Sequence, residues 1–270
     1  MKFFHHVSAS AVLILSGLLL PVGAQQESGS GTKNKLPPAL THYKGRQIAQ
    51  TMHDLGAPWL VRESRNREED TQQLLRELKL KPGQAVCDIG CGNGFYTLPM
   101  AKAVGEKGRV LAVDIQPQML KFLKDRAAKA DLSNIELILG TLVDPRLPKG
   151  KLDAVLLVDV YHEFSHPEQM LRAIRESLNP TGVVVLAEFR MEDPKVPIKL
   201  LHKMSKKQIM KEFPANGFRL AREYDELPWQ HLMFFQRDDA PRKDADKKED
   251  DAPGKDAGKK TDQSKKPSGS

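Results

Sequence analysis

Three glycines at alternate positions, Gly90, Gly92 and Gly94, separate a predicted strand from a predicted helix. Glycine adopts positive φ without steric cost and lets the backbone come close to a ligand, while the following helix offers unpaired N–H groups in its first turn. A second predicted strand ends in Asp114, twenty residues after Gly94. A carboxylate at that place can accept hydrogen bonds from both hydroxyls of a ribose. The pattern predicts an α/β fold with a site for a nucleoside-containing cofactor.

Strand and helix patterns alternate through the central part of the chain, as expected for repeated β-α-β units. Such units form a mostly parallel sheet with helices on both faces, and ligands bind beyond the carboxyl ends of its strands. Strands are predicted over residues 84–90, 109–115, 135–140, 152–160, 182–189, 218–227 and 231–236. Helices are predicted over residues 65–79, 95–104, 117–130, 167–178 and 206–213, with Ser64 and Ser205 as N-caps of the first and last.

Three prolines bear on the helix boundaries. Pro117 and Pro167 suit the first position of a helix, where the missing N–H removes no hydrogen bond. Pro99 falls inside the helix predicted over residues 95–104, and a proline there is expected to kink it.

The glycine spacing distinguishes between two kinds of nucleoside cofactor. In the dinucleotide fingerprint G-x-G-x-x-G the third glycine permits tight packing of the helix on the strand, but counting from Gly90 and Gly92 that position is Phe95. The segment instead spells D-x-G-x-G-x-G from Asp88, which resembles the signature of class I S-adenosylmethionine-dependent methyltransferases. The resemblance covers about residues 70–236 and is closest to the ubiquinone/menaquinone-methyltransferase-like (type 11) small-molecule group.

This resemblance implies a fold, an activity and a cofactor. The fold is a Rossmann-like sheet of seven strands, mostly parallel with the last strand antiparallel, with helices on both faces. The activity is methyl transfer from S-adenosyl-L-methionine to a small-molecule acceptor. Residues 110–114 match the second motif of the family, and residues 178–182 resemble its L-x-P-G-G stretch. Gly140 and Thr141 stand where the family usually places an aspartate, which this chain lacks.

The same resemblance implies which residues hold the cofactor. Asp88 would orient the glycine loop or the amino group of the cofactor, Asp114 would bind the ribose, and Ile115 would pack on the adenine. The full set predicted in this way is Asp88, Gly90, Cys91, Gly92, Asn93, Gly94, Asp114, Ile115, Gly140, Thr141 and Asp159.

Residues 159–163 follow the fourth predicted strand, where the family brings acceptor and methyl group together. His162 is a candidate general base because the reference pKa of histidine is near neutral, and Tyr161 or Glu163 is a candidate for binding the acceptor. The alternative is an ordinary loop end whose polar groups are satisfied locally. Further candidates for the acceptor side or its lid are Glu188, Arg190, His202, Trp229, His231, Tyr43, Trp59 and Arg62.

Residues 162–166 spell H-E-x-x-H, which binds zinc where both histidines lie on one helix. Here Pro167 follows at once, and the residue before a proline avoids the α region, so no metal site is expected. Two rival functions stay open: a nucleoside-binding module that has lost catalysis, and a zinc hydrolase that acts through this motif.

The two ends of the chain differ from its centre. Residues 1–24 carry Lys2, an apolar run and small residues before Gln25, which is typical of a secretory signal peptide. We therefore expect export to the periplasm or beyond, or a membrane anchor if the segment is not cleaved. Residues 25–40 are interpreted as a linker, residues 41–238 as the methyltransferase domain with an N-terminal helical lid, and residues 239–270 as a disordered Lys/Asp-rich tail.

The formal net charge of +7 would suit a nucleic-acid partner, but no basic stripe with interleaved aromatic residues is present, so none is expected. The expected partner is the small-molecule acceptor, stable membrane insertion is not expected after cleavage, and the oligomeric state stays open. Cys87 and Cys91 are not expected to form a disulfide, because four extended residues span about 13 Å and disulfide Cα atoms lie within about 7 Å.

Overall fold

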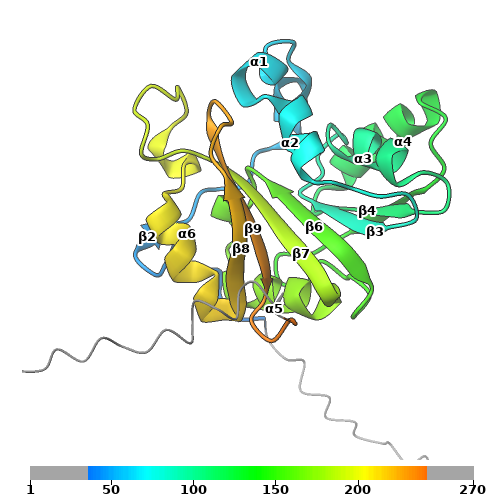
Figure 1. Ribbon diagram of the computed structural model, residues 1–270. Helices are drawn as coiled ribbons and strands as arrows, with labels where there is room; N and C mark the ends of the chain where they lie inside the picture. Colours follow the sequence, from blue (N-terminus) through cyan, green and yellow to red (C-terminus); the bar gives the residue numbers. More distant parts are fainter. Residues whose placement is uncertain (1–35, 242–270) are drawn as a thin grey trace, which may run out of the picture. The chain divides into compact units, whose positions relative to one another are not determined.

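The computed structural model describes residues 36–241, so the predicted signal peptide, most of the linker and most of the tail lie outside the described residues. A seven-stranded sheet in the order β5-β4-β3-β6-β7-β9-β8 forms its centre (Figure 1). Strands β3 to β7 run parallel to one another, and β9 is antiparallel to both of its neighbours. This confirms the expected sheet. Its strands are β3 (Ala85–Ile89), β4 (Arg109–Asp114), β5 (Ile135–Leu139), β6 (Leu152–Val158), β7 (Leu178–Phe189), β8 (Phe218–Tyr224) and β9 (Gln230–Arg237).

Helices cover both faces of this sheet, as its apolar strands require. On β6, Val155 and Leu157 point into one hydrophobic cluster with residues of α5 and α6. The alternating residues Ala154 and Leu156 point into a second cluster with residues of α2 and α3. Because successive side chains of a strand face opposite sides, a buried parallel strand reads as a continuous apolar run. The helices are α1 (Arg65–Glu69), α2 (Thr71–Glu77), α3 (Thr97–Val104), α4 (Pro117–Lys129), α5 (Pro167–Ser177) and α6 (Lys206–Glu212).

The helix predicted over residues 65–79 is two helices in the structure. Asp70 adopts a left-handed conformation with φ of 46° between α1 and α2, which breaks the helix. Its carboxylate then accepts a hydrogen bond from the N–H of Gln73 and caps α2. Ser64 makes no side-chain cap. The sequence pattern missed the break because the charges and leucines on either side both fit helical spacing.

The prolines lie where helices begin. Pro117 and Pro167 are the first residues of α4 and α5, as predicted. Helix α3 begins at Thr97, two residues later than predicted, and this places Pro99 in the first turn. The N–H groups of a first turn have no partner within the helix, so Pro99 removes no hydrogen bond there. Ser205 caps α6 as predicted, by accepting from the N–H of Gln208 at 3.1 Å.

The segment before α1 crosses the loop that follows β6. It contains the short strands β1 (His42–Tyr43) and β2 (Arg46–Gln47) and the 3-10 helix η1 (Asp54–Val61). The N–H of Leu40 donates to the carbonyl of Ser165 at 2.9 Å, and the N–H of Ala49 donates to the carbonyl of His162 at 3.1 Å. These bonds hold the segment over the carboxyl end of the sheet. The segment predicted to be a helical lid therefore contains two short strands and a 3-10 helix as well as α1.

Two further features concern the described residues. No helix within residues 36–241 combines the length and the hydropathy that a membrane span needs. Cys87 and Cys91 are both buried and both carry free thiols.

Candidate active site

A cavity of about 410 Å³ opens at the carboxyl ends of β3, β4 and β6. Its floor includes Gly90 after β3, Asp114 at the end of β4, and Asp159 after β6. The lid closes its other side with residues of η1 and α1. A ligand held here lies at the point where the strand order reverses, as expected for an open α/β sheet.

Glycine is required where the loop after β3 faces the cavity. Gly90 has φ of 68° and Gly92 has φ of 52°, a region that side chains with Cβ rarely adopt. A Cβ at Gly90 would lie 2.4 Å from Cγ2 of Val160, and one at Gly92 would lie 2.6 Å from Cδ1 of Leu60. Both the backbone conformation and the packing therefore exclude a larger residue, and the loop presents bare backbone to a ligand.

Asp114 joins this loop to the end of β4. One carboxylate oxygen accepts from the N–H of Gly92 at 2.9 Å, and the other accepts from the N–H of Gln116 at 2.8 Å. Burial raises the pKa of Asp114, and the hydrogen bonds from the backbone oppose that rise. A carboxylate has about four acceptor positions, so Asp114 can accept two more hydrogen bonds from the cavity side.

Several predicted cofactor residues support the loop without lining the cavity. Asp88 is buried and accepts from the hydroxyl of Thr97 at 2.6 Å, which ties the end of β3 to α3. Burial raises the pKa of Asp88 to about 6. The amide of Asn93 donates to the carbonyl of Ala57 at 2.9 Å, which ties the loop to the lid. The others of this kind are Cys91, Gly94 and Gly140, which are packed beneath the cavity.

Ile115 and Thr141, which the sequence predicts to lie beside the adenine, both line the cavity. Thr141 makes a closed turn with Asp144: the N–H of Asp144 donates to the hydroxyl of Thr141 at 2.9 Å. Asp144 does not itself line the cavity. The turn fixes the backbone at the place where the family usually has an aspartate.

Asp159 is strained and incompletely bonded. It has φ of 51°, and one carboxylate oxygen accepts from the amide of Gln230 at 2.7 Å. The other, Oδ1, is buried and has no hydrogen-bond partner within residues 36–241. Burial raises the pKa of Asp159 well above its usual value, and the charges of Glu69 and Glu188 add to that rise. Asp159 lines the cavity, so a cationic ligand group there would find an acceptor already in place.

His162 lies at the far end of the cavity with its ring held by Glu188. The ring Nδ1 lies 2.7 Å from Oε2 of Glu188, and because a carboxylate only accepts, Nδ1 carries the proton. Burial alone would lower the pKa of His162, but the charge and hydrogen bond of Glu188 raise it above its usual value. The other ring nitrogen, Nε2, faces the cavity side and lies 3.1 Å from Nδ1 of His202.

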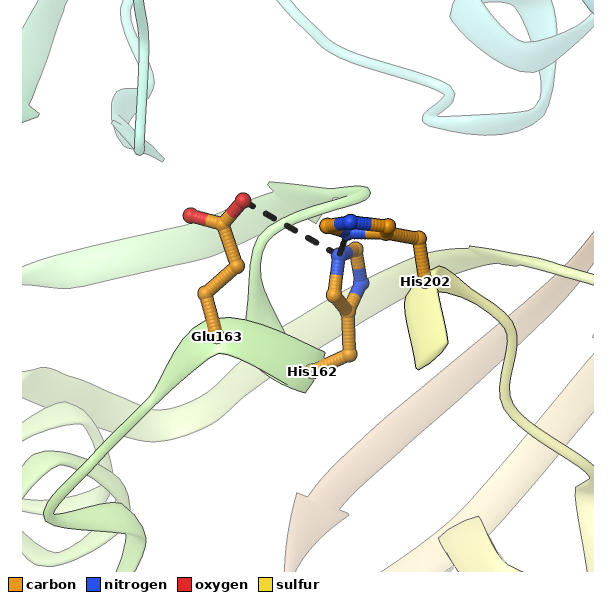
Figure 2. Close-up of side chains that lie close together, drawn as sticks. All are labelled: His162, Glu163 and His202. Atoms are coloured by element: carbon orange, nitrogen blue, oxygen red, sulfur yellow. Dashed lines mark hydrogen bonds and ion pairs between the residues drawn. The ribbon is translucent and has the colours of Figure 1, made fainter. Parts of the chain in front are cut away.

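Glu163 and His202 complete this end of the cavity (Figure 2). Oε1 of Glu163 lies 4.0 Å from Nε2 of His162 and accepts from the N–H of Met52 at 3.2 Å. Burial raises the pKa of Glu163 to about 7, although the charge of His162 opposes the rise. His202 comes from the 3-10 helix η3 (Leu200–His202), after β7.

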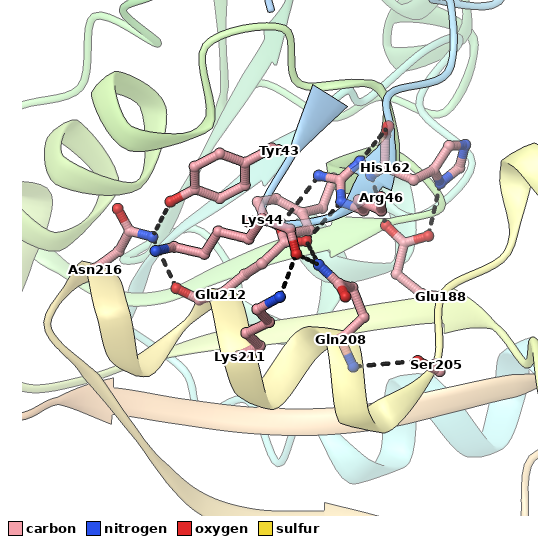
Figure 3. A network of polar contacts seen from close by, with 11 residues as sticks. Tyr43, Lys44, Arg46, His162, Glu188, Ser205, Gln208, Lys211, Glu212 and Asn216 are labelled. Atoms are coloured by element: carbon pink, nitrogen blue, oxygen red, sulfur yellow. Dashed lines mark hydrogen bonds and ion pairs between the residues drawn. The ribbon is translucent and has the colours of Figure 1, made fainter. Parts of the chain in front are cut away.

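Tyr161, a sequence candidate for binding the acceptor, does not line the cavity. Its side chain is fully buried, and its hydroxyl donates to Glu212 at 2.6 Å. Arg46 donates to the same carboxylate at 2.7 Å and to the carbonyl of His162 at 3.0 Å (Figure 3). Tyr161 therefore belongs to a network that fixes the backbone of His162 from below.

The H-E-x-x-H residues do not share a helix. The 3-10 helix η2 covers Tyr161–Glu163, and α5 begins at Pro167 with His166 as its N-cap residue. His166 is next to Ser165, whose hydroxyl lies 3.0 Å from its Nδ1. His166 is not one of the residues gathered around His162.

Other sequence candidates divide between the cavity and its surroundings. Trp59 and Arg62 line the cavity, as predicted for a lid. Arg65 and Glu69 also line it and were missed, because an Arg and a Glu four residues apart are typical of a solvated helix surface. Four candidates lie elsewhere. The hydroxyl of Tyr43 accepts from the amide of Asn216, and the ring of His231 bonds Glu192. Arg190 donates to the carbonyl of Asp225, and the carbonyl of Trp229 accepts from the N–H of Arg190.

Comparisons with known proteins agree with this geometry. A family model described as a methyltransferase domain matches residues 80–250. The demethylmenaquinone methyltransferase of Shouchella clausii is 27% identical over 159 residues, which cover 58% of this chain and 66% of that protein. The alignment therefore spans just under two thirds of that relative.

Two solved structures show the same fold. The SAM dependent methyltransferase from Aquifex aeolicus is 24% identical, with a TM-score of 0.65 over 68% of this chain and 98% of that chain. The [4+2]-cyclase SpnF is 21% identical, with a TM-score of 0.51 over 58% of this chain and 60% of that chain. One is a methyltransferase by name and the other a cyclase, so the fold by itself does not decide the chemistry.

Proposed function

The chain belongs to the methyltransferase-domain family, and we propose on that basis that it transfers a methyl group from S-adenosylmethionine to a small-molecule acceptor. The observation that carries the proposal is the bond between Asp114 and the N–H of Gly92 at 2.9 Å. This bond holds the carboxylate that we propose binds the ribose directly beside a bare backbone loop at the carboxyl edge of the sheet.

The described residues fit this cofactor along the whole cavity. Asp114 has acceptor positions left for the two ribose hydroxyls, and Ile115 offers an apolar surface for the adenine. Asp159 offers a buried oxygen without a partner, which suits the amino group of the methionine moiety. Arg65 also lines the cavity, its charge acts on Asp159, and it would hold the carboxylate of that moiety. When bound, the cofactor supplies a methyl group on a positively charged sulfur.

Methyl transfer of this kind is an in-line displacement, so most of the contribution of the protein is positioning. The lid over the cavity, with Trp59 and Arg62, would keep water from the reacting atoms. If the acceptor loses a proton, Nε2 of His162 is the atom placed to accept it, since Nδ1 is committed to Glu188 at 2.7 Å.

The far end of the cavity suits an acceptor that is largely apolar with one polar group. Beside His162, Glu163 and His202, the lining includes the apolar side chains of Phe164, Met170, Phe189, Pro197 and Ile198, together with Ser165 and Lys199. The name of the Shouchella clausii relative makes a demethylated naphthoquinol the first acceptor to test. Its identity of 27% supports the class of acceptor more than the compound.

The experiment is a pair of measurements on the full chain. Calorimetry with S-adenosylhomocysteine should show binding, and labelled methyl donor should be transferred to a quinol or to an extract of small apolar molecules. Absence of cofactor binding would defeat the whole proposal. Binding without transfer to any acceptor would leave the second candidate, a module that holds the cofactor without methylating; the fold it shares with the SpnF cyclase is the observation in its favour.

A further inference from the structure

Three side chains at the acceptor end of the cavity have the composition of a metal site. Nε2 of His162, Nδ1 of His202 and a carboxylate oxygen of Glu163 all lie within 4.8 Å of one another. They come from two 3-10 helices: η2 follows β6, and η3 lies between β7 and α6 (Figure 2). We propose that these three residues bind a divalent transition-metal ion of the zinc type. The inference concerns this ion alone and does not depend on methyl transfer.

The separations between the ligand atoms match those around a small ion. Two ligands bound tetrahedrally at about 2.1 Å from zinc lie about 3.4 Å apart. The two ring nitrogens of His162 and His202 are 3.1 Å apart, and Oε1 of Glu163 is 4.0 Å from Nε2 of His162. The carboxylate oxygen of Glu163 would therefore need to move closer to Nε2 of His162 when an ion binds.

The protonation pattern leaves the correct atoms free for a metal. Glu188 accepts from Nδ1 of His162 at 2.7 Å, so the lone pair of a neutral ring is on Nε2 and points toward His202. A histidine ligand whose other nitrogen donates to a carboxylate is the usual arrangement around a protein metal ion, because it fixes the ring and raises its basicity. Two imidazole nitrogens 3.1 Å apart must share either a proton or a cation.

The ligand set also indicates the type of ion and its exposure. Two imidazoles and one carboxylate suit zinc and its transition-metal neighbours, whereas magnesium prefers oxygen ligands. All three residues line the cavity, so further coordination positions would face the acceptor, as in catalytic rather than structural sites. In the metal-bound protein Nε2 of His162 is a ligand and not a base, and the ion itself would lower the pKa of a hydroxyl bound to it.

This site differs from the one that the H-E-x-x-H sequence suggests. That motif would use both of its histidines, His162 and His166, on one helix. The arrangement in the structure replaces His166 with His202, which lies forty residues after His162 in the chain. The two arrangements make different predictions for substitution of His202.

The test is a titration of the full chain with Co²⁺, followed in the visible spectrum and then by competition with Zn²⁺. We expect one ion to bind with the spectrum of a low-coordinate nitrogen and oxygen site, and Mg²⁺ not to compete. His202→Gln should weaken binding at least tenfold, and Glu188→Gln by about tenfold to a hundredfold. Melting temperature and S-adenosylhomocysteine binding, measured on each variant, separate loss of the metal from loss of the fold.

Two control variants keep the result interpretable. His42 is exposed, so His42→Gln should leave metal binding unchanged. His5 and His6 are adjacent in the sequence and are replaced together by Gln to remove binding outside the cavity. If Co²⁺ does not bind to that double variant, or binds equally well after His202→Gln, the proposed site is refuted. Loss of metal binding with intact cofactor binding leaves the proposed function untouched.

Discussion

The carboxylate of Asp114 accepts a hydrogen bond from the backbone N–H of Gly92 at 2.9 Å, which connects the end of β4 to the glycine loop after β3. The bond passes between neighbouring parallel strands. It aligns the one acidic group at the end of β4 with a stretch of backbone that has no side chain to obstruct a ligand. The two features that the sequence places twenty residues apart are thus a single structural unit.

Replacement of Asp114 by Asn should weaken cofactor binding roughly tenfold to a hundredfold, because a hydrogen bond to a charged group contributes about 1.5–3 kcal/mol. The Asn side chain would also place an N–H donor against the N–H of Gly92 or of Gln116, and two donors cannot form a hydrogen bond. Calorimetry with S-adenosylhomocysteine gives the affinity. Asp125 is exposed on α4, and Asp125→Asn serves as the matched control with unchanged affinity. Equal affinities for both variants would remove Asp114 from the site.

Gly90→Ala should lower the free energy of unfolding and abolish cofactor binding. Gly150 is a matched control, since its φ of 67° equals that of Gly90 within a degree and no heavy atom of the described residues lies within 4 Å of its added Cβ. Both alanines should cost about 1–2 kcal/mol for left-handed backbone. Gly90→Ala should cost a further ~1–3 kcal/mol, because its Cβ meets Val160 at 2.4 Å.

A second substitution separates the two parts of that cost. Val160→Ala removes the methyl group that the new Cβ would meet, so the double variant with Gly90→Ala should recover much of the additional loss. Urea unfolding of the four proteins measures this coupling. If the changes in unfolding free energy of the two single variants simply add in the double variant, the contact between residues 90 and 160 is not the cause of the additional loss.

Binding of S-adenosylmethionine should strengthen as pH rises, with release of a proton from Asp159. Burial raises the pKa of Asp159, the charges of Glu69 and Glu188 add to that rise, and Arg65 opposes it, while Tyr96 also faces this group. A cationic ligand favours the ionised carboxylate, so the bound protein holds fewer protons than the free protein. Affinity therefore increases with pH until the raised pKa of the free protein is passed.

The matched variant for this prediction is Asp159→Asn, which retains an acceptor for Gln230 but cannot ionise. Its affinity should be lower and should lose the increase with pH. Calorimetry in two buffers of different ionisation enthalpy counts the released proton directly. If affinity rises equally with pH in the Asp159→Asn variant and in the unaltered protein, the released proton comes from a group other than Asp159.

Tyr161→Phe should destabilise the protein while leaving turnover per folded molecule nearly unchanged. The hydroxyl of Tyr161 donates to the buried carboxylate of Glu212 at 2.6 Å, and loss of one partner of such a pair costs about 1–3 kcal/mol. Tyr224→Phe is the control, because its hydroxyl bonds Glu226 at the surface. Thermal melting and a methyl-transfer assay measure the two quantities. A large fall in turnover without destabilisation would return Tyr161 to a catalytic role.

The predicted signal peptide leads to a prediction on the mature protein. Residues 11–22 form the apolar run, and Gly23 and Ala24 are small residues before Gln25. We therefore propose that the exported protein begins at Gln25. Intact mass and N-terminal sequencing of protein from the periplasm or medium decide this. A chain that retains Met1 in the membrane fraction would indicate an anchor instead.

The parts of the fold that were predictable are those governed by neighbouring residues. Pro117 begins its helix because a proline at that position loses no hydrogen bond, and residues 152–158 form a buried strand because their apolar run has no polar alternation. The glycine loop was predictable as well, because its conformation also depends on residues that are neighbours in the sequence. The helix break at Asp70 was not predictable. A non-glycine residue rarely adopts left-handed backbone, and whether it does so depends on contacts formed in the folded protein.

The acceptor end was only partly predictable, because its geometry joins distant segments. His162 could be placed from its position after a strand, but nothing near His202 in the sequence indicates that it lies 3.1 Å from His162. The position of Tyr161 was misjudged for a related reason. Adjacent residues near a strand end point alternately toward the cavity and toward the core. For Tyr161 and His162, the hydrogen bond from Tyr161 to Glu212 shows which of the two points toward the core.

Both hydrogen bonds to the carbonyl of His162, from Ala49 and from Arg46, start in the segment that precedes the sheet. Detachment of that segment would therefore release the backbone beneath the histidine at the same moment as it uncovers the cavity. Entry of an acceptor and assembly of the groups that receive it are then one motion. A chain that begins at residue 50 should keep its sheet and still bind the nucleoside, but it should bind and methylate acceptors poorly.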